Sequence, residues 1–240
     1  MNLLAFETST EACSVALWLD GEVRERHELA PRRHAELSLP WAEQLLSEAG
    51  IKRSQLDAIA IGRGPGAFTG VRLAIAIAQG IALALDKPIV PVSTLAVLAM
   101  RAHGLSEPAQ ANARVFAAID ARMGEVYTAA FELRDGDAIA LSEEAVLAPN
   151  EAIVPGQDNG WFGVGTGFAA AEGALAQAQR TRFVAIDPAA LPHAADLARL
   201  AALAYARGEV VAPERVEPAY LRNNVALTIA EQIALRAKSK

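Results

Sequence analysis

Residues 62–85 read GRGPGAFTGVRLAIAIAQGIALAL, a turn of glycine and proline followed by a long apolar segment. The preceding residues 56–61, LDAIAI, form a short apolar run that predicts a buried strand. Beyond the turn, the apolar run is long enough for about four helical turns and predicts a helix over residues 69–85. A strand that passes through a tight turn into a helix is the building unit of α/β folds, so we predict that class.

The turn itself allows three interpretations. A glycine turn between a strand and a helix can hold an anion on its backbone N–H groups. A P-loop would need Gly-Lys-Ser/Thr where residues 70–72 are GVR, so we exclude it. A dinucleotide-binding loop is disfavoured because Pro65 stiffens the turn, although Asp86 lies at a suitable distance beyond it. We favour a tight turn that lets the chain reverse into a closely packed helix.

The predicted helix over residues 69–85 is apolar around its whole circumference, so each of its sides needs a cover. Small residues recur along it at intervals of four and allow another backbone to approach closely. One stripe consists of Gly66, Gly70, Ala74, Ala78 and Ala82, and a second of Ala76, Gly80 and Ala84. Two interpretations stay open: a core helix sandwiched within one domain, or a subunit interface. The predicted helix over residues 34–49, bearing Leu37, Trp41 and Leu45, would complete such an interface.

Strands and helices alternate along the rest of the chain in two similar sets. The first set has strands over residues 3–6, 13–19, 22–29, 56–61 and 88–92 and helices over 34–49, 69–85 and 94–101. The second has strands over residues 115–119, 125–133 and 161–165, a turn over 120–124, an Ala-rich helix after 167, and helices over 193–207 and 223–238. An acidic residue ends the first strand of each set, Glu7 and Asp120. An Asp-Gly hairpin signal follows the second strand of each set. We infer two similar lobes, with chance similarity as the alternative.

Composition restricts the function. The 240 residues are 52% hydrophobic and 21% charged, as in a folded globular protein, and the net charge is −6. A protein that holds tRNA by itself usually has a basic surface, because neutralising phosphates dominates the affinity. We therefore expect any nucleic acid to be held through a partner.

The single cysteine, Cys13, excludes an internal disulfide and favours a reducing cytosol. The first residues, MNLLAFETST, lack the basic start of a secretory signal, so we expect a cytoplasmic protein. The most apolar stretch, residues 73–85, is interrupted by Gln79 and Gly80 and is too short to span a bilayer. We expect no association with membranes.

Catalytic and metal-binding residues are not apparent. Residues 7–10, ETST, stand where actin-like ATPases and sugar kinases place an aspartate and a glycine-rich turn. Here the acid is one carbon longer and the turn has no glycine, so we expect the three hydroxyl groups to bond the backbone of their own turn. Residues 164–167, VGTG, resemble the adenosine-side loop of the same superfamily, but Gly-x-Gly is common between strand and helix. The four histidines, His27, His34, His103 and His193, show no metal-ligand spacing, and Cys13 lies in a predicted apolar strand where a thiol is usually inert.

Five segments together resemble the TsaB family, formerly called YeaZ. They are LAFETSTEACSVAL near the start, GRGPGAFTGVRLAIAIAQGIA in the middle, IDARMGEVYTAAF opening the second half, and VGTGF and EPAYLR after it. They occur in order over almost the whole chain, and Gly-Pro-Gly-x-Phe-Thr-Gly is the most specific of them. Glu7 departs from the aspartate usual in that family, a further step away from nucleotide chemistry.

The resemblance implies two tandem RNase H-like lobes with mixed sheets, of the actin and sugar-kinase (ASKHA) type. We place the first lobe at residues 1–108 and the second at 109–215, with a last helix within 216–240 that packs back on the first lobe. It also implies a non-catalytic partner of TsaD, the enzyme that forms threonylcarbamoyladenosine (t6A) at position 37 of tRNAs reading codons that begin with adenine. The ATPase TsaE joins the pair, and members of the family can also self-associate, so a dimer of the chain alone is left open. Neither a metal nor a cofactor is expected on this chain alone; a nucleotide at the TsaD junction is left open.

The partner-binding residues that follow from this resemblance and from the apolar helix are Leu37, Trp41, Leu45, Gly66, Phe68, Thr69, Arg72, Ala76 and Gly80. The alternative is an active ATPase or small-molecule kinase of the same superfamily. It would use Glu7, Asp120 and the two glycine loops. A protease is unsupported, because no Ser-His-Asp order or zinc motif is present.

Overall fold

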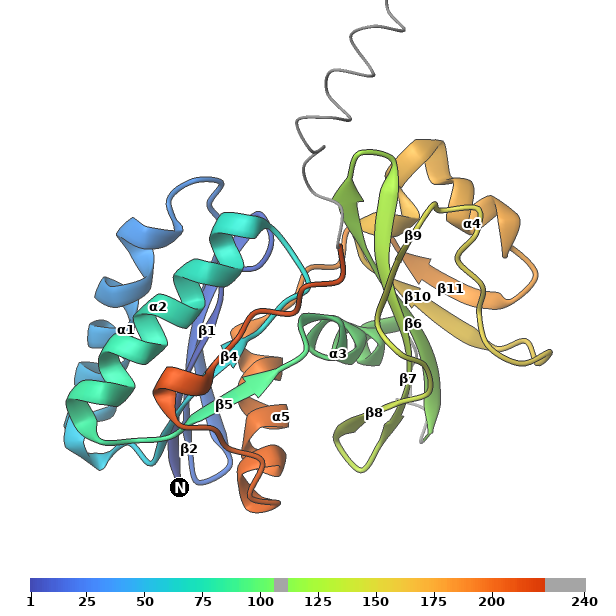
Figure 1. The fold of residues 1–240 in the computed structure, drawn as a ribbon. Coiled ribbons are helices and arrows are strands. Elements are labelled where there is room, and N and C mark those ends of the chain that lie inside the picture. Colours follow the sequence, from blue (N-terminus) through green and yellow to red (C-terminus); the bar gives the residue numbers. More distant parts are fainter. Residues whose placement is uncertain (106–111, 223–240) are drawn as a thin grey trace, which may run out of the picture.

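The computed structural model describes residues 1–105 and 112–222 and shows two α/β lobes, each built on a mixed sheet (Figure 1). The sheet of the first lobe has the strand order β3-β2-β1-β4-β5. Its strands are β1 (Asn2–Glu7), β2 (Ala12–Leu19), β3 (Glu22–Leu29), β4 (Ala58–Gly62) and β5 (Ile89–Val92). β1, β2 and β3 pair antiparallel, and β4 and β5 continue from β1 in parallel. The hairpin between β2 and β3 turns at Asp20 and Gly21, which both have positive φ, as a type I′ turn requires.

The sheet of the second lobe repeats this plan. Its strands are β6 (Ala113–Arg122), β7 (Glu125–Arg134), β8 (Asp137–Ala140), β9 (Ala145–Leu147), β10 (Trp161–Val164) and β11 (Phe183–Asp187). The order β8-β7-β6-β10-β11 has the same sequence of antiparallel and parallel pairs as the first sheet, and β9 adds to β7. The predicted pair of similar lobes is therefore confirmed, and the repeated arrangement is that of the actin and sugar-kinase fold.

The turn predicted over residues 120–124 is shorter in the structure. β6 continues to Arg122, paired with Glu125 of β7 after an irregularity in the ladder. Only Met123 and Gly124, both with positive φ, lie between the two strands. The prediction was wrong here because the antiparallel ladder outweighs the low strand preference of the acidic residue.

Three long helices cover the first sheet. α1 (His34–Ala49) and α2 (Phe68–Leu85) lie on one face and α5 (Ala194–Ala206) on the other (Figure 1). Alternate strand residues supply the two cores, as the two-residue period of a strand requires. Leu4, Phe6, Ile59 and Ile61 face α1 and α2, and Leu3, Ala5, Ala58 and Ala60 belong to the core shared with α5. The helix predicted over residues 34–49 is confirmed with the same bounds, closed by Gly50 in the left-handed conformation.

The core on the α5 side continues into the second lobe. α3 (Thr94–Ala99) packs against β6 and β7, and its side chains share one apolar cluster with α5 and with strand residues of both sheets. α5 lies within the span predicted for the second lobe, residues 109–215, and yet covers the sheet of the first. The chain therefore crosses between the lobes more often than the predicted boundary implies, and the two lobes share a core.

The Ala-rich segment after residue 167 is less helical than predicted. It forms short 3₁₀ turns and a single short helix, α4 (Ala174–Ala178). Ala171, Glu172 and Gly173 all have positive φ, which interrupts any continuous helix. The helix predicted over residues 223–238 lies outside the described residues. Of the segment 216–240 predicted to pack on the first lobe, residues 216–222 are described: Val216 joins the core under α1 and α2, and the N–H of Ala219 donates to the carbonyl of Arg63.

Candidate functional site

The two small-residue stripes of α2 face opposite ways. Gly70, Ala74, Ala78 and Ala82 are buried against the first sheet, together with Val71 and Ile75. A Cβ atom on Gly70 would lie 2.0 Å from the carbonyl oxygen of Thr8, so the helix approaches the β1–β2 turn as closely as its backbone allows. This stripe makes the close helix-to-sheet contact expected of a core helix.

The outer stripe of α2 is open to solvent. Ala76, Gly80 and Ala84 are exposed, and no atom lies within 4 Å of the Cβ position of Gly80. Phe68 at the start of the helix and Leu83 near its end are 69% and 63% exposed. The described residues thus leave an apolar face uncovered. We call it the outer face of α2: Phe68, Thr69, Ala76, Gly80, Leu83 and Ala84.

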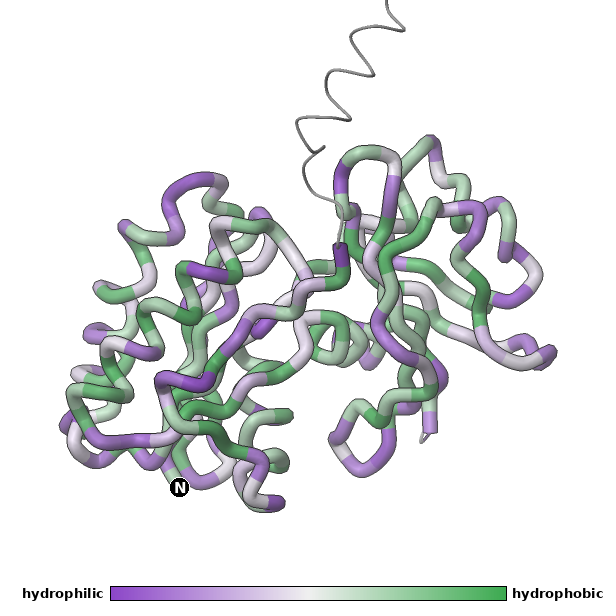
Figure 2. The backbone as a smooth tube through the Cα atoms, in the orientation of Figure 1, coloured by the Kyte–Doolittle hydropathy of each residue, from purple (hydrophilic) through white to green (hydrophobic). Residues whose placement is uncertain are grey.

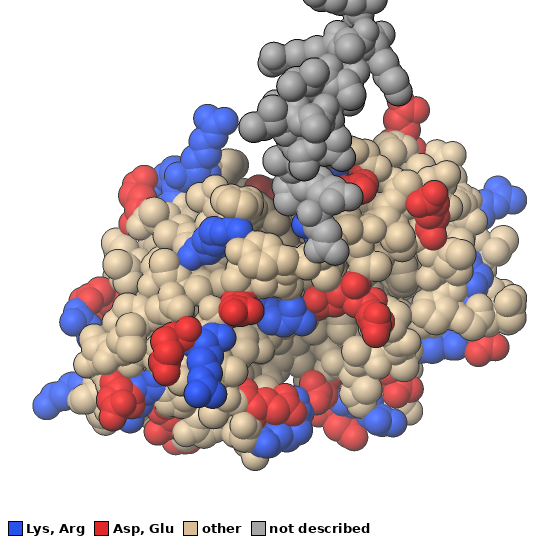
Figure 3. Space-filling model, viewed as in Figure 1, with Lys and Arg blue, Asp and Glu red and all other residues tan. Residues whose placement is uncertain are grey.

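The composition of α2 is unusual for a surface helix. Most of the 18 residues of α2 are apolar, but only six of them are buried. Among the described helices α2 alone is long and apolar enough to cross a membrane, by length and composition only. Here it packs on β4, β1 and α1, as a helix of a folded lobe does. The tube in Figure 2 is mostly green along α2. The charged side chains in Figure 3 are spread over the face and are densest along the lower edge of the molecule.

Most of the predicted partner-binding residues lie on or beside this face. Thr69, Ala76, Gly80 and Phe68 are exposed, and Leu37, Trp41, Gly66 and Arg72 are half-buried. Leu45 is only 1% exposed, so its prediction as a partner-binding residue is wrong: it packs in the core between α1 and the sheet. Gly66 has a role inside the chain, since a Cβ there would lie 2.4 Å from the carbonyl oxygen of Ser9. Leu83 was missed, although its spacing of seven residues from Ala76 places it on the same helical face.

The carboxyl group of Glu7 is sealed inside the first lobe. The residue is 1% exposed, and its Oε1 accepts a hydrogen bond of 2.7 Å from the N–H of Ser9. A Cβ atom on Gly62 would lie 1.9 Å from Oε2, so the carboxyl group fills the space that the glycine leaves. Burial raises the pKa of Glu7 above its usual range, although hydrogen bonds from Ser9 and Thr94 act against the rise. The Glu7 carboxyl group therefore fills the space between the β1–β2 turn and the glycine loop that begins at Gly62. It does not face solvent.

The hydroxyl groups around Glu7 join three segments. Thr94 at the start of α3 lies 3.0 Å from the hydroxyl of Ser9 and accepts a hydrogen bond of 3.1 Å from the N–H of Gly64. Thr8 donates to the carbonyl of Gly70 at 2.7 Å, so it bonds α2 and not its own turn as predicted. Thr10 does bond its own turn, accepting from the N–H of Ala12 at 3.4 Å. Thr94 was missed by the sequence analysis, although Ser-Thr before an apolar run is a helix-start signal.

Glu7→Gln should keep the chain folded and remove a loss of stability that grows with pH. Because the folded-state pKa of Glu7 is raised, the wild-type chain loses stability as pH rises from the ordinary glutamate pKa of 4.5 through the raised pKa. Glutamine keeps an acceptor for Ser9 and carries no charge. The melting temperature of Glu7→Gln relative to wild type should therefore rise between pH 4.5 and pH 8, as measured by circular dichroism. The exposed neighbour Glu11→Gln is the control and should show no such trend. A relative melting temperature that falls with pH would mean that the ionised carboxylate is stabilised there.

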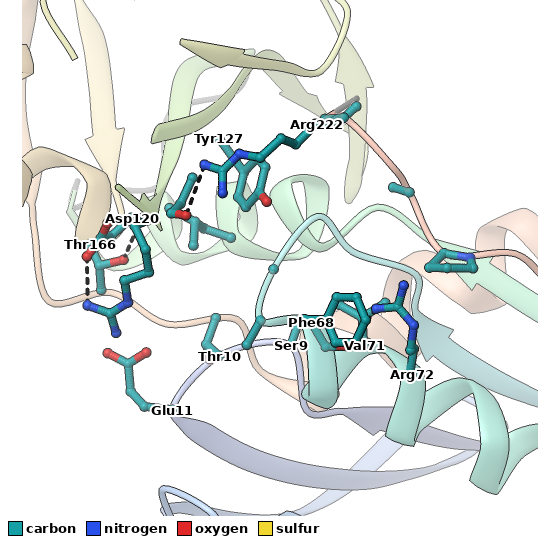
Figure 4. Close-up of a pocket in the computed structure, with 18 of the residues that line it drawn as sticks. Ser9, Thr10, Glu11, Phe68, Val71, Arg72, Asp120, Tyr127, Thr166 and Arg222 are labelled. Atoms are coloured by element: carbon teal, nitrogen blue, oxygen red, sulfur yellow. Dashed lines mark hydrogen bonds and ion pairs between the residues drawn. The ribbon is translucent and has the colours of Figure 1, made fainter. Parts of the chain in front are cut away.

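A cleft of about 530 Å³ opens between the lobes (Figure 4). Thr10 and Arg72 line it from the first lobe, and Asp120, Tyr127 and Thr166 from the second. Asp120 is engaged by Arg122, whose backbone N–H and guanidinium both bond its carboxylate. Glu7 is not among the residues that line this cleft, so the two acids that an ATPase or kinase would use do not face a common space.

The second glycine loop, residues 164–167, is also closely packed against its own lobe. A Cβ atom on Gly165 would lie 2.2 Å from the carbonyl oxygen of Ala118, and one on Gly167 would lie 2.7 Å from the Ala118 side chain. The glycines thus let the loop press against β6. This explains the Gly-x-Gly pattern through the fold alone.

Three of the four histidines make contacts within the chain. The rings of His27 and His193 stack at 4.0 Å, and His193 lies 3.1 Å from Glu25. Burial by itself would raise the pKa of Glu25, but hydrogen bonds from His193 and from the N–H of Ala195 outweigh it and lower the pKa. His34 contacts two carbonyl oxygens of the β1–β2 turn. Within residues 1–105 and 112–222, no three or more His, Cys, Asp or Glu side chains gather as metal ligands would.

Comparison with known proteins gives consistent results along the whole chain. The family model described as TsaD, tRNA N6-adenosine threonylcarbamoyltransferase, matches residues 26–230. The tRNA threonylcarbamoyladenosine biosynthesis protein TsaB of Escherichia coli is 44% identical over 94% of this chain and 96% of its own length. The TsaB protein of Haemophilus influenzae is 39% identical over 94% and 95%.

Structure comparison agrees with these relatives. The solved structure of YeaZ from Pseudomonas aeruginosa superposes with a TM-score of 0.83 at 49% identity, covering 92% of this chain and 99% of that one. A tRNA N6-adenosine threonylcarbamoyltransferase from Magnetococcus marinus is 51% identical over 65 residues, 27% of this chain and 18% of that protein. The chain therefore belongs to the wider family that the TsaD model describes and, within it, to the TsaB family.

Proposed function

We propose that this chain is a non-catalytic subunit in the biosynthesis of t6A in tRNA, and that it docks on TsaD through the outer face of α2. The observation that carries the proposal is the uncovered face itself, with Ala76 and Gly80 at its centre. Apolar surface of this extent on a soluble chain is typical of a protein-binding site. Small residues at its centre favour a partner helix, because they let two helix axes come close.

The kind of partner follows from the family. The TsaD model matches residues 26–230, which include α1 and α2, so TsaD carries the corresponding pair of helices. The outer face of α2 and the corresponding helical face of TsaD can pack about an approximate two-fold axis, as the two copies do in an isologous dimer. The helices of the two subunits would then form a four-helix arrangement. The same geometry would allow the free chain to self-associate, with a second copy in place of TsaD.

Three observations support a role without catalysis. The Glu7 carboxyl group is buried against Gly62, where a phosphate or its metal would need access. Asp120 bonds Arg122 in the cleft and does not share a space with Glu7. The VGTG loop is pressed against β6. In this proposal the chain orders its partner and adds surface for TsaE and tRNA in the cytoplasm.

The net charge of −6 indicates how tRNA would be bound. Because phosphate contacts need clustered Lys and Arg, tRNA would be held chiefly by the other subunits of the complex. Any nucleotide would be held at the TsaD junction, with residues of both subunits.

Reconstitution tests the proposal. TsaD, TsaE, tRNA and the donor of the threonylcarbamoyl group are combined with and without this chain, and t6A is measured by mass spectrometry of digested tRNA. Modification should reach its full extent only when the chain is present, and the chain alone should form none. Equal modification without the chain would refute the proposal. Tight binding of ATP and Mg²⁺ by the isolated chain in calorimetry, with turnover lost in Glu7→Gln, would instead support a kinase or ATPase.

A further inference from the structure

Arg72 is held between two exposed aromatic rings at the start of α2. Its guanidinium carbon lies 3.4 Å from the ring centre of Phe68 and 5.1 Å from that of Tyr220. One terminal nitrogen donates to the carbonyl of Phe68 at 2.9 Å, and the other to the hydroxyl of Tyr220 at 2.7 Å. Figure 4 shows Phe68 and Arg72 side by side at the rim of the cleft. We call these three residues the Arg72 stack.

The chain anchors Tyr220 firmly at this place. Its segment follows the 3₁₀ turn Pro213–Arg215, whose first carbonyl accepts a hydrogen bond of 2.9 Å from the side chain of Gln79 on α2. The N–H of Ala219 donates to the carbonyl of Arg63 at 2.9 Å. Two residues beyond Tyr220, Arg222 donates to the carbonyl of Ala121 at 3.2 Å in the second lobe. Tyr220 is therefore fixed from both sides and is still 63% exposed.

The aromatic rings of the stack lie outside the apolar core. Phe68 and Tyr220 keep most of their surface in solvent, and neither belongs to an apolar cluster of the core. Within the described part of the chain, no carboxylate lies within 4 Å of the Arg72 guanidinium. Arginine and aromatic residues that are ordered before binding dominate the affinity at protein interfaces, because little further entropy is lost on association.

We propose that the Arg72 stack extends the outer face of α2 into one docking surface, and that Arg72 receives a carboxylate of the TsaD subunit. This inference rests on the proposed function and names a further part of the same interface. Phe68 belongs to both surfaces, so the two are continuous. Each terminal nitrogen of Arg72 uses one N–H for Phe68 or Tyr220, and among the described residues the second N–H of each and the Nε–H make no hydrogen bond, so they can donate to a carboxylate.

A protein partner fits the stack better than RNA does. Bases that bind to proteins stack on open aromatic faces. Here the guanidinium already covers one face of the Phe68 ring at 3.4 Å. On one side of the stack lies the uncharged outer face of α2. On the cleft side, Arg122 and Arg222 are paired with Asp120 and Glu125, which leaves less positive charge for a phosphate backbone.

Affinity for TsaD measures the contribution of the stack. We expect Arg72→Ala and Tyr220→Ala each to weaken binding by at least about tenfold in calorimetry. Because the two residues contact each other, the double variant should lose less affinity than the product of the two single losses. Tyr220→Phe keeps the ring and loses only the hydroxyl, so it should bind more tightly than Tyr220→Ala. Arg72→Lys keeps the charge without the planar fork and should retain little of the affinity. Ile153→Ala, a 70% exposed apolar residue in the second lobe, is the control and should bind as wild type.

The outcomes separate this inference from the proposed function. If Arg72→Ala and Tyr220→Ala bind TsaD as wild type while a substitution at the centre of α2 abolishes binding, the inference is refuted and the docking of α2 stands. If all of these variants bind normally, both are refuted. If the two stack variants bind TsaD normally but the assembled complex loses affinity for tRNA, the stack is an RNA contact and the inference is refuted. Circular dichroism establishes that each variant is folded before its affinity is compared.

Discussion

Ala76→Arg should leave the chain folded and abolish its binding to TsaD. Ala76 is exposed on the outer face of α2, and arginine is a good helix former, so the free chain can place the new side chain in water. In the complex, the same side chain would lie in a close contact between helices, where an unpaired charge is strongly unfavourable. We expect affinity to fall by at least about a hundredfold, which corresponds to about 2.7 kcal/mol.

Calorimetry with purified TsaD and the t6A assay both measure this loss. Gly80→Leu is a second variant of the same kind, because no atom lies within 4 Å of the Cβ position of Gly80. Ala206→Arg is the matched control, since Ala206 is exposed at the end of α5 on the opposite face of the first sheet. Wild-type affinity in a folded Ala76→Arg variant would show that the outer face of α2 is not the interface.

Gly70→Ala should destabilise the chain by about 3 kcal/mol or more, whereas Gly80→Ala on the same helix should stabilise it by about 0.5–1 kcal/mol. The added Cβ at position 70 would meet the carbonyl oxygen of Thr8 at 2.0 Å, and a backbone atom cannot move aside as a flexible side chain can. At position 80 the new methyl group meets nothing, and the unfolded chain loses conformational freedom.

Urea unfolding followed by circular dichroism gives both free energies. The two variants make the same chemical change ten residues apart on one helix, so differences in helix propensity cancel between them. Equal effects at the two positions would contradict the assignment of an inner and an outer stripe. Gly80→Ala also tests how closely the partner approaches, because a stabilised chain with weakened binding to TsaD would locate the closest contact between the helices.

Much of the fold could be predicted because its signals are local. The α1 helix has periodic apolar residues and a glycine stop at Gly50, and both hairpins have an Asp-Gly turn. The placement of α5 could not be predicted, because an apolar helical face does not indicate which of two sheets it will cover. The prediction of a long helix after residue 167 was wrong for another reason. Alanine favours a helix locally, but the backbone at Ala171 has positive φ. There the contacts of the surrounding structure outweigh the intrinsic preference.

The candidate site was predictable in its location and not in its details. Both stripes of α2 follow from residue spacing, but only the coordinates show that Gly70 faces the sheet and Gly80 faces solvent. The burial of Leu45 could not be predicted, because an interface and a core are made from the same apolar residues. The departure at Glu7 was visible in the sequence, whereas its contact with Gly62 joins positions 55 residues apart and depends on the pairing of β1 with β4.

The position of α5 also affects how a nascent chain can fold. All five strands of the first sheet have been synthesised by Val92, but the helix that covers one of its faces begins only at Ala194. At about 5–20 residues per second, roughly ten seconds of translation separate the two. During this interval one apolar face of the sheet has no helix on it, and it stays so in any chain whose synthesis stops within the second lobe. Fragments that end there would be bound by chaperones or degraded, so the first lobe completes its folding only near the end of translation.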